Sequence, residues 1–404
     1  MFLTVVGDWS TTISLIFGGC CSNAITLEQL TTQYPLSGSL ITVFQFLLIS
    51  LHGIPSHITW TKYGPRFKPH RIPLTPYLVQ VTLFYFISLL NNAAFSYRIP
   101  MSVHIIFRSG GLVISMLLGW LVAGKRYTLT QVASVFLVTL GVVLTTLSAS
   151  DVKSTSDSTS TSTSIYVRGI SILTLALLLS GFLGLVQDYT YSRYGRPPSG
   201  SEKTASANPT PTWQESMFYL HFLALPFFFF VRHDIAVQLV SVNAGPRTSF
   251  AVPLPRTLLA ALAIPPPFAL PFSTLFWPAV APSKSPRPIT LHRATRDGAP
   301  ALVLGAPQAY LPLLLNTLTQ LLCVAGVHRL TTRVSALTVT LVLVVRKAAS
   351  LVISVWMGGG ARVNQGMMWT GAGLVLAGTI GYSVATGRAR ERARPVEAEK
   401  KKTE

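Results

Sequence analysis

The stretch that decides the fold runs from Leu89 to Tyr127 and reads LLNNAAFSYRIPMSVHIIFRSGGLVISMLLGWLVAGKRY. It reads as a hydrophobic hairpin of membrane helices, yet Arg108 lies inside its second apolar run, eight residues beyond Pro100. His104 lies one helical turn before Arg108, on the same face. A charge at the centre of a bilayer costs about 2.5–3.5 kcal/mol on insertion scales, so an arginine in this position indicates a function.

A second stretch near the C-terminus repeats this arrangement. Leu337–Val355, LTVTLVLVVRKAASLVISV, carries Arg346 and Lys347 in an apolar run. Both charged stretches continue with Leu-Val-Ile-Ser, at Leu112–Ser115 and Leu351–Ser354. Adjacent residues of a helix point about 100° apart, so Arg346 and Lys347 cannot face the same way. We expect the cations of both stretches to line an aqueous cavity that holds an anion.

The composition places the chain in a membrane. Half of its 404 residues are hydrophobic and only 11% are charged, and the mean hydropathy is +0.49, whereas soluble domains carry about 25% charged residues. The net charge of +19 comes mainly from loops and the C-terminus, as the positive-inside rule predicts, and no nucleic-acid-binding motif accompanies it. The composition therefore predicts an all-α polytopic membrane protein that does not bind nucleic acid.

We expect ten transmembrane helices in two inverted five-helix repeats. The charged helices are then the fourth and the ninth, and inverted repeats place a substrate site near the midplane between them. The expected spans are Trp9–Leu27, Leu40–Ile58, Thr75–Phe95, Met101–Ala123, Thr130–Leu147, Ile165–Val186, Glu215–Val231, Ala309–Val327, Ala336–Met357 and Met367–Ala385.

The remaining segments divide the chain. Residues 1–147 form the first five-helix half and residues 165–385 the second, joined by a Ser/Thr-rich lumenal linker at 148–164. Residues 232–300 are a long insertion whose many prolines would break a helix, so we expect no span there. Residues 386–404 form a basic cytosolic tail.

The basic residues of the short loops predict that both termini lie in the cytosol. With a cytosolic N-terminus, eleven fall on the cytosolic side and four on the other. The cytosolic residues are Lys62, Arg66, Lys68, Arg71, Lys125, Arg126, Arg193, Arg196, Lys203, Arg329 and Arg333, and the opposite ones are Arg98, Lys153, Arg168 and Arg362.

The acidic residues avoid the expected spans. All thirteen fall in loops, tails or span ends, whereas a cation- or proton-coupled carrier needs a carboxylate inside the membrane. A cavity with positive charge alone favours an anion, and guanidinium suits phosphate through bidentate hydrogen bonds. Cys20, Cys21 and Cys323 form neither a disulfide framework nor a metal site, and we interpret them as helix-packing residues.

Ten polar residues are candidates for substrate binding. Several have a structural alternative: Arg108 could bond helix-end carbonyls, His104 could be a packing residue, and Asn91 and Asn92 could join helices by hydrogen bonds. The candidates are Asn91, Asn92, His104, Arg108, Ser109, Asn316, Gln320, Arg346, Lys347 and Ser350.

The runs NNAAFSYRIPMSVHIIFRSGG, GKRYT and LLLNTLTQLLCVAGVHRLTTRVSALTVTLVLVVRK resemble nucleotide-sugar transporters. The resemblance is to the UDP-N-acetylglucosamine/UDP-xylose branch of the drug/metabolite transporter superfamily. It implies ten helices in two inverted halves and exchange of a nucleotide sugar for a nucleoside monophosphate. The family's lysine-arginine-tyrosine is matched at Lys125–Tyr127 and its arginine-lysine at Arg346 and Lys347. The chain departs from the family at 232–300 and at the glycine-rich Gly358–Gly366.

We therefore expect an antiporter, not an enzyme, that exchanges cytosolic UDP-N-acetylglucosamine for lumenal UMP. Alternatives are UDP-xylose, UDP-glucuronate or another organic phosphate as substrate, or a membrane scaffold that transports nothing. Lys401 and Lys402 resemble the dilysine retrieval signal of endoplasmic reticulum membrane proteins, which predicts binding to the COPI coat. The expected location is the endoplasmic reticulum membrane, with the Golgi membrane as the alternative. No cofactor or metal is expected, and membrane lipid and a second copy of the chain, as a homodimer, are further candidate partners.

Overall fold

The computed structural model describes residues 2–34, 37–62, 64–95, 110–150, 163–194, 211–253, 290–296, 299–357 and 364–403. The chain divides into two compact units. Unit 1 comprises Met1–Cys21, Gly53–Leu223 and Cys323–Glu404, and unit 2 comprises Ser22–His52 and Ala224–Leu322. These boundaries differ from those of the two expected five-helix halves, whose inverted relation stays a prediction.

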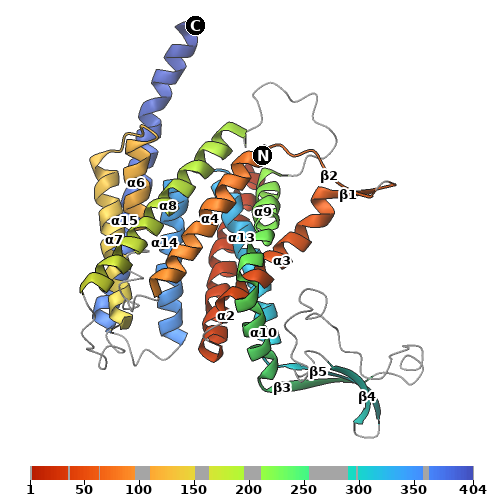
Figure 1. Cartoon of the computed structure of the whole chain (residues 1–404). Helices are drawn as coiled ribbons and strands as arrows, with labels where there is room; N and C mark the ends of the chain where they lie inside the picture. The colour runs from red at the N-terminus through yellow and green to blue at the C-terminus, as the bar shows by residue number, and fades with distance from the viewer. Residues whose placement is uncertain are drawn as a thin grey trace. The chain divides into compact units, whose positions relative to one another are not determined.

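Unit 1 is mainly helical (Figure 1). Its helical segments are α1 (Phe2–Ser14), the π-helical segment η1 (Leu15–Gly19), α4 (Leu74–Phe95), α6 (Gly111–Leu121), α7 (Leu129–Ser150), α8 (Thr163–Tyr194), α9 (Thr212–Phe222), α14 (Ala336–Met357) and α15 (Gln365–Thr403). A short antiparallel hairpin, β1 (Ile58–Thr61) with β2 (Gly64–Phe67), also belongs to it.

Unit 2 combines helices with a small sheet. It holds the 3-10 segment η2 (Leu225–Val231), α10 (Arg232–Ala244), β3 (Arg247–Pro253), β4 (Thr290–Arg296) and β5 (Ala299–Pro307). The strands form an antiparallel sheet in the order β3-β5-β4. The helices α2 (Cys20–Gln33), α3 (Gly38–His57) and α13 (Tyr310–Thr331) have residues in both units. The expectation of helices alone therefore missed two small sheets, which form where turn residues interrupt the helical pattern.

Seven helical stretches of the described residues are long and apolar enough to cross a membrane. They are Val6–Thr31, Gly38–His57, Leu74–Asn91, Val167–Tyr194, Thr212–Ala244, Tyr310–Thr331 and Gln365–Ala389. Shorter apolar helices occur at Gly111–Leu121, Leu129–Thr145 and Ala336–Arg346. The chain is thus a polytopic, mostly helical membrane protein.

The seventh expected span ends later than the sequence suggests. Its helical path continues from Val231 through α10 to Ala244, although Arg-His-Asp at 232–234 reads as a polar boundary. Asp234 accepts hydrogen bonds from the hydroxyl of Ser39 and the side-chain amide of Gln238, both at 2.7 Å. Because this carboxylate has partners inside unit 2, a charge in the helix is tolerated.

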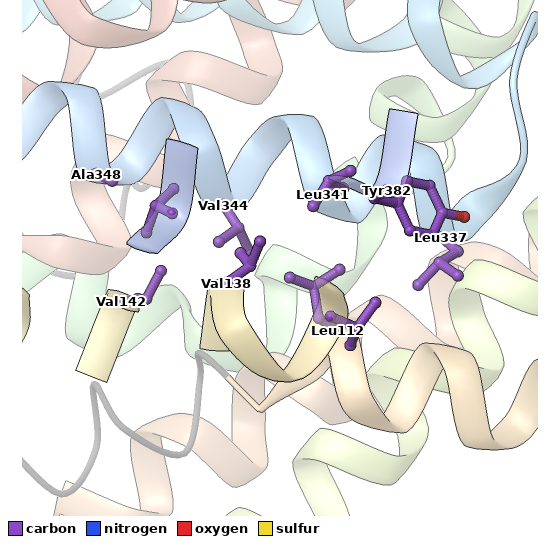
Figure 2. Packing of buried hydrophobic residues seen from close by; sticks show 10 residues of the cluster. Leu112, Val138, Val142, Leu337, Leu341, Val344, Ala348 and Tyr382 are labelled. Carbon is purple, nitrogen blue, oxygen red and sulfur yellow. The ribbon is translucent and has the colours of Figure 1, made fainter. Parts of the chain in front are cut away.

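The core of unit 1 lies around α14. Its residues Leu337, Leu341, Val344 and Ala348 repeat at helical spacing and are buried against apolar side chains of α6, α7 and α15 (Figure 2). Leu112 of α6 belongs to the same cluster. This apolar face of α14 fixes the direction in which the opposite face points.

Helices α7 and α15 run side by side (Figure 1) and come into close backbone contact at two glycines. A Cβ atom added at Gly141 would lie 2.6 Å from the carbonyl oxygen of Gly371, and one added at Gly371 would lie 2.7 Å from that of Gly141. Small residues permit such backbone contact between membrane helices, where dispersion drives association.

Candidate functional site

Arg346 occupies the face of α14 opposite the apolar core. Val339 and Val342, on the same side of the helix, pack in a cluster with Ile16 of η1. Arg346 follows Val342 by four residues and so continues this stripe toward the N-terminal helix. The local sequence therefore places a guanidinium group where another apolar side chain would complete the packing.

The guanidinium group of Arg346 is incompletely paired. One terminal nitrogen, Nη1, donates a 3.4 Å hydrogen bond to the carbonyl oxygen of Cys20. Its Nε is buried without a hydrogen-bond partner, and the described residues provide it with no carboxylate. A half-buried, partly unsatisfied cation costs free energy, and its unused N–H donors favour an anionic partner.

The cysteines next to this arginine correct the sequence analysis. Cys20 and Cys323 form a disulfide, so their interpretation as packing residues was wrong, whereas Cys21 is buried and outside any disulfide. The two cysteines are 303 residues apart in the chain. Local sequence patterns do not show that residues so far apart lie close together in space. The disulfide joins the start of α2 to α13, and the carbonyl of Cys20 is the one that Arg346 contacts.

Asn316 of α13 is fully buried in unit 2, and both of its side-chain polar atoms have partners. Its Oδ1 accepts a 2.7 Å hydrogen bond from the amide of Gln45. Its Nδ2 donates to the carbonyl of Asn23 at 3.3 Å and to the hydroxyl of Thr26 at 3.2 Å. These contacts join three helices, so Asn316 has a structural role whether or not it also contacts a substrate.

The other candidates are only partly visible. Asn91 donates a 2.9 Å hydrogen bond to the carbonyl of Ile87 in its own helix, and Gln320 is half-buried on α13. His104, Arg108 and Ser109 lie outside the described residues. Helical backbone is described, but no side chain, for Asn92, Lys347, Ser350, Lys401 and Lys402.

Unit 1 contains a cavity of about 670 Å³ between the end of α6, the last turns of α8 and the α13–α14 turn. Pockets of roughly 300–1,000 Å³ accommodate small organic ligands. The lining includes Lys125, Asp188, Tyr189 and Arg333 among apolar and hydroxyl side chains. The cavity is therefore large enough for a small ligand and contains charge of both signs.

Both cations of the cavity lining are paired with carboxylates. Lys125 forms an ion pair with Asp188 of α8. Arg333 contacts Asp8 of α1 at 2.6 Å. Helix α8 extends to Tyr194, eight residues beyond the expected end of the sixth span, so Asp188 lies within an apolar helix rather than in a loop.

The turn that presents Lys125 depends on Gly124. Gly124 has a φ of +62°, the left-handed conformation with which glycine ends many helices. The N–H of Lys125 then donates to the carbonyl of Gly119 at 2.9 Å. Burial, with smaller contributions from Tyr382 and Asp188, raises the pKa of Tyr127 to about 12, so its hydroxyl stays neutral at physiological pH.

Comparison with known proteins decides the family. The sequence pattern of the UAA transporter family matches residues 9–265 and 284–386, which together are most of the chain. This chain belongs to the UAA transporter family. The unmatched residues 266–283 lie within the proline-rich segment 232–300 that the sequence analysis describes as an insertion.

Three transporters from different organisms align along 85–93% of this chain. A UDP-xylose and UDP-N-acetylglucosamine transporter of Danio rerio is 31% identical, with 92% of both chains covered. An endoplasmic reticulum GDP-fucose transporter of Drosophila melanogaster is 33% identical over 93% of this chain and 90% of its own. A UDP-N-acetylglucosamine transporter of Schizosaccharomyces pombe is 33% identical over 85% of both.

A protein of known crystal structure shares the fold of this UAA transporter. It superposes with a TM-score of 0.50 at 13% identity, covering 93% of this chain and 98% of the other. At this identity, the similarity concerns the fold alone.

Asp188 is the cavity residue that the sequence analysis missed in this UAA transporter. Lys125 and Arg333 were recognised as loop cations and Lys125 also as part of the family's lysine-arginine-tyrosine. Asp188 was assigned to a loop because the expected sixth span ended at Val186. Asp188 lies two residues beyond that boundary, on the side of the membrane where Lys125 was also expected. This shared position was the signal from which their pairing could have been predicted.

Proposed function

We propose that this UAA transporter is a nucleotide-sugar antiporter that moves UDP-N-acetylglucosamine from the cytosol into the lumen in exchange for UMP. The observation that carries the proposal is Arg346, a partly unsatisfied guanidinium in a mainly apolar helix. Relatives named as transporters of UDP-N-acetylglucosamine, at 31–33% identity, favour this substrate.

Phosphate recognition follows from the chemistry of this arginine. A guanidinium group presents five N–H donors in a planar fork and stays charged in any protein environment, so it can bind a phosphate through two parallel hydrogen bonds. Only one hydrogen bond is formed by Arg346 with the described residues. We assign Arg108 the corresponding role in the first half and Lys347 or Ser350 a supporting role beside Arg346.

Exchange without ion coupling follows from the same charges. An empty carrier must move an unneutralised cation through the occluded state, which raises that barrier. A bound nucleotide neutralises the cation in both directions, so each passage requires a nucleotide. UDP-sugar entering and UMP leaving would satisfy this requirement.

Topology and location are part of this proposal. The seven long and three shorter apolar helices of the described residues are compatible with ten spans, and α7 and α14 each contain 22 residues, about 33 Å of helix. Ten spans and the distribution of basic residues favour two cytosolic termini. We propose residence in the endoplasmic reticulum, with the Golgi as the alternative, and retrieval by COPI through Lys401 and Lys402.

The nearest alternative is another nucleotide sugar. UDP-xylose is named for one relative and GDP-fucose for another, so both the sugar and the base must be tested. UDP-glucuronate and other organic phosphates complete the panel.

The test is exchange by the full chain in proteoliposomes. Vesicles loaded with UMP, GMP, AMP or buffer are presented with each labelled nucleotide sugar. We expect UMP-loaded vesicles to take up UDP-N-acetylglucosamine faster than all others. Uptake of GDP-fucose driven by internal GMP would reassign the base, and no trans-stimulated uptake of any nucleotide sugar would overturn the proposal.

A further inference from the structure

The cavity of unit 1 has an unusual charge arrangement for a carrier of anions. Lys125 and Arg333 line it, and each is already paired with a carboxylate, Asp188 and Asp8 respectively. The cavity lining therefore holds two cations that a phosphate could use, and one of the two carboxylates that neutralise them, Asp188, lies in the same lining.

The Lys125–Asp188 pair is suited to being exchanged. The side chain of Lys125 is 38% exposed and that of Asp188 is 21% exposed, so water screens the pair. Ion pairs in such positions contribute little net free energy. Lysine is a point charge on a flexible stem with three donors, so its ammonium group can turn from a carboxylate to a phosphate without movement of the backbone.

A phosphate group can compete with Asp188 for this lysine. The monoester phosphate of UMP carries about 1.5–2 negative charges at pH 7 and three acceptor oxygens, and the diphosphate of a UDP-sugar carries one charge on each of its phosphates. The carboxylate carries one charge and two oxygens. Arg333 lines the same cavity and can add a second cation. Only the weak Lys125–Asp188 pair has to break, because Arg333 contacts Asp8 through Nη2 and a guanidinium group has further donors for the anion.

We infer that this cavity is an entry site for the phosphate groups of the nucleotide, in which Asp188 occupies Lys125 until a phosphate displaces it. This inference rests on the proposed function and deepens it. Under the proposed orientation, the cavity opens on the cytosolic side. Asp188 neutralises Lys125 in the empty carrier. When a phosphate displaces Asp188, the ion pair that joins the end of α6 to α8 is broken.

The inference predicts opposite effects for the two partners. Asp188→Asn removes the competing carboxylate and is expected to tighten UMP binding about two- to five-fold, which is what a partly exposed pair costs to break. Lys125→Gln is expected to weaken UMP binding, and the double variant should bind UMP no better than Lys125→Gln. Uridine, which has no phosphate, should show none of these differences.

The experiment measures the dissociation constant of UMP and of uridine from ligand-induced thermal stabilisation of the solubilised full chain. Glu28→Gln, an exposed position of α2, is the control because it changes the net charge equally and lies outside the cavity. Wild-type exchange in proteoliposomes is measured on the same preparation.

The outcomes separate the two proposals. Tighter UMP binding by Asp188→Asn but not by Glu28→Gln supports the entry site. Unchanged or weaker binding by Asp188→Asn, when the wild type exchanges normally, overturns the entry site and leaves the antiporter proposal intact. Absent exchange by the wild type overturns the antiporter, and absent UMP binding by every variant overturns the entry site.

Discussion

Replacing Arg346 with methionine should leave the protein at least as stable as the wild type while weakening nucleotide binding. The wild-type guanidinium forms one hydrogen bond, at the long distance of 3.4 Å, and leaves Nε buried and unpaired. Loss of a weak hydrogen bond costs about 0.5 kcal/mol, whereas relieving an unsatisfied buried donor gains about 1–3 kcal/mol. The balance favours Arg346→Met in the empty protein.

The effect on binding should have the opposite sign. A hydrogen bond to a charged group contributes about 1.5–3 kcal/mol, which corresponds to a loss of roughly 10- to 150-fold in affinity. The assay pairs the unfolding midpoint of the empty protein with its dissociation constant for UMP. Arg346→Lys keeps the positive charge but loses the planar guanidinium group, so its affinity for UMP should lie between those of the wild type and Arg346→Met.

Arg329→Met is the matched control for this experiment. Arg329 also has a buried unpaired Nε, but its guanidinium lies 4.5 Å from the ring of Trp213 and 3.8 Å from a carboxylate oxygen of Asp8. Its loss removes a cation–π contact of about 0.5–2 kcal/mol, which offsets the gain from removing the unpaired donor, so the unfolding midpoint should rise less than in Arg346→Met. The affinity for UMP should be unchanged. A folded Arg346→Met protein with wild-type affinity for UMP would refute the reasoning.

Three further substitutions test the packing of the helices. Gly371→Leu should lower the unfolding midpoint strongly because a side chain there meets backbone at 2.7 Å, whereas Gly373→Leu, which has open space, should not; equal midpoints would contradict the close approach. Asn316→Leu should cost about 1–3 kcal/mol of stability, since it leaves the amide of Gln45 without its 2.7 Å acceptor; an unchanged midpoint in thermal unfolding would exclude this role. Cys20→Ser should lower the midpoint by removing a long-range crosslink worth about 2–5 kcal/mol, and reductant should destabilise only the wild type; equal sensitivity to reductant would argue against the disulfide.

The sequence was sufficient to determine the class of the protein. Apolar runs of about 20 residues can only cross a bilayer as helices, because no backbone group can remain unpaired in lipid. The exceptional position of Arg346 could be recognised for the same reason, since the cost of a charge in an apolar run depends on local composition. The apolar face of α14, on which Leu337, Leu341 and Val344 are buried, was not predicted.

Span boundaries were less predictable, because polar residues can be accommodated inside a helix when a distant partner exists. Asp188 and Asp234 both looked like the ends of spans, and both lie within helical paths in which other segments supply their partners. The two small sheets were missed because short strands between proline-rich segments have little periodicity of their own.

Only the tertiary structure revealed how distant side chains combine. The 303 residues between Cys20 and Cys323 contain no local signal for a disulfide, and the partners of Asn316 come from two other helices. The pairing of Lys125 with Asp188 likewise depends on α6 and α8 meeting at one end. Composition and periodicity are properties of neighbouring residues, so they determine which segments are helices, whereas pairing between segments depends on how those helices pack.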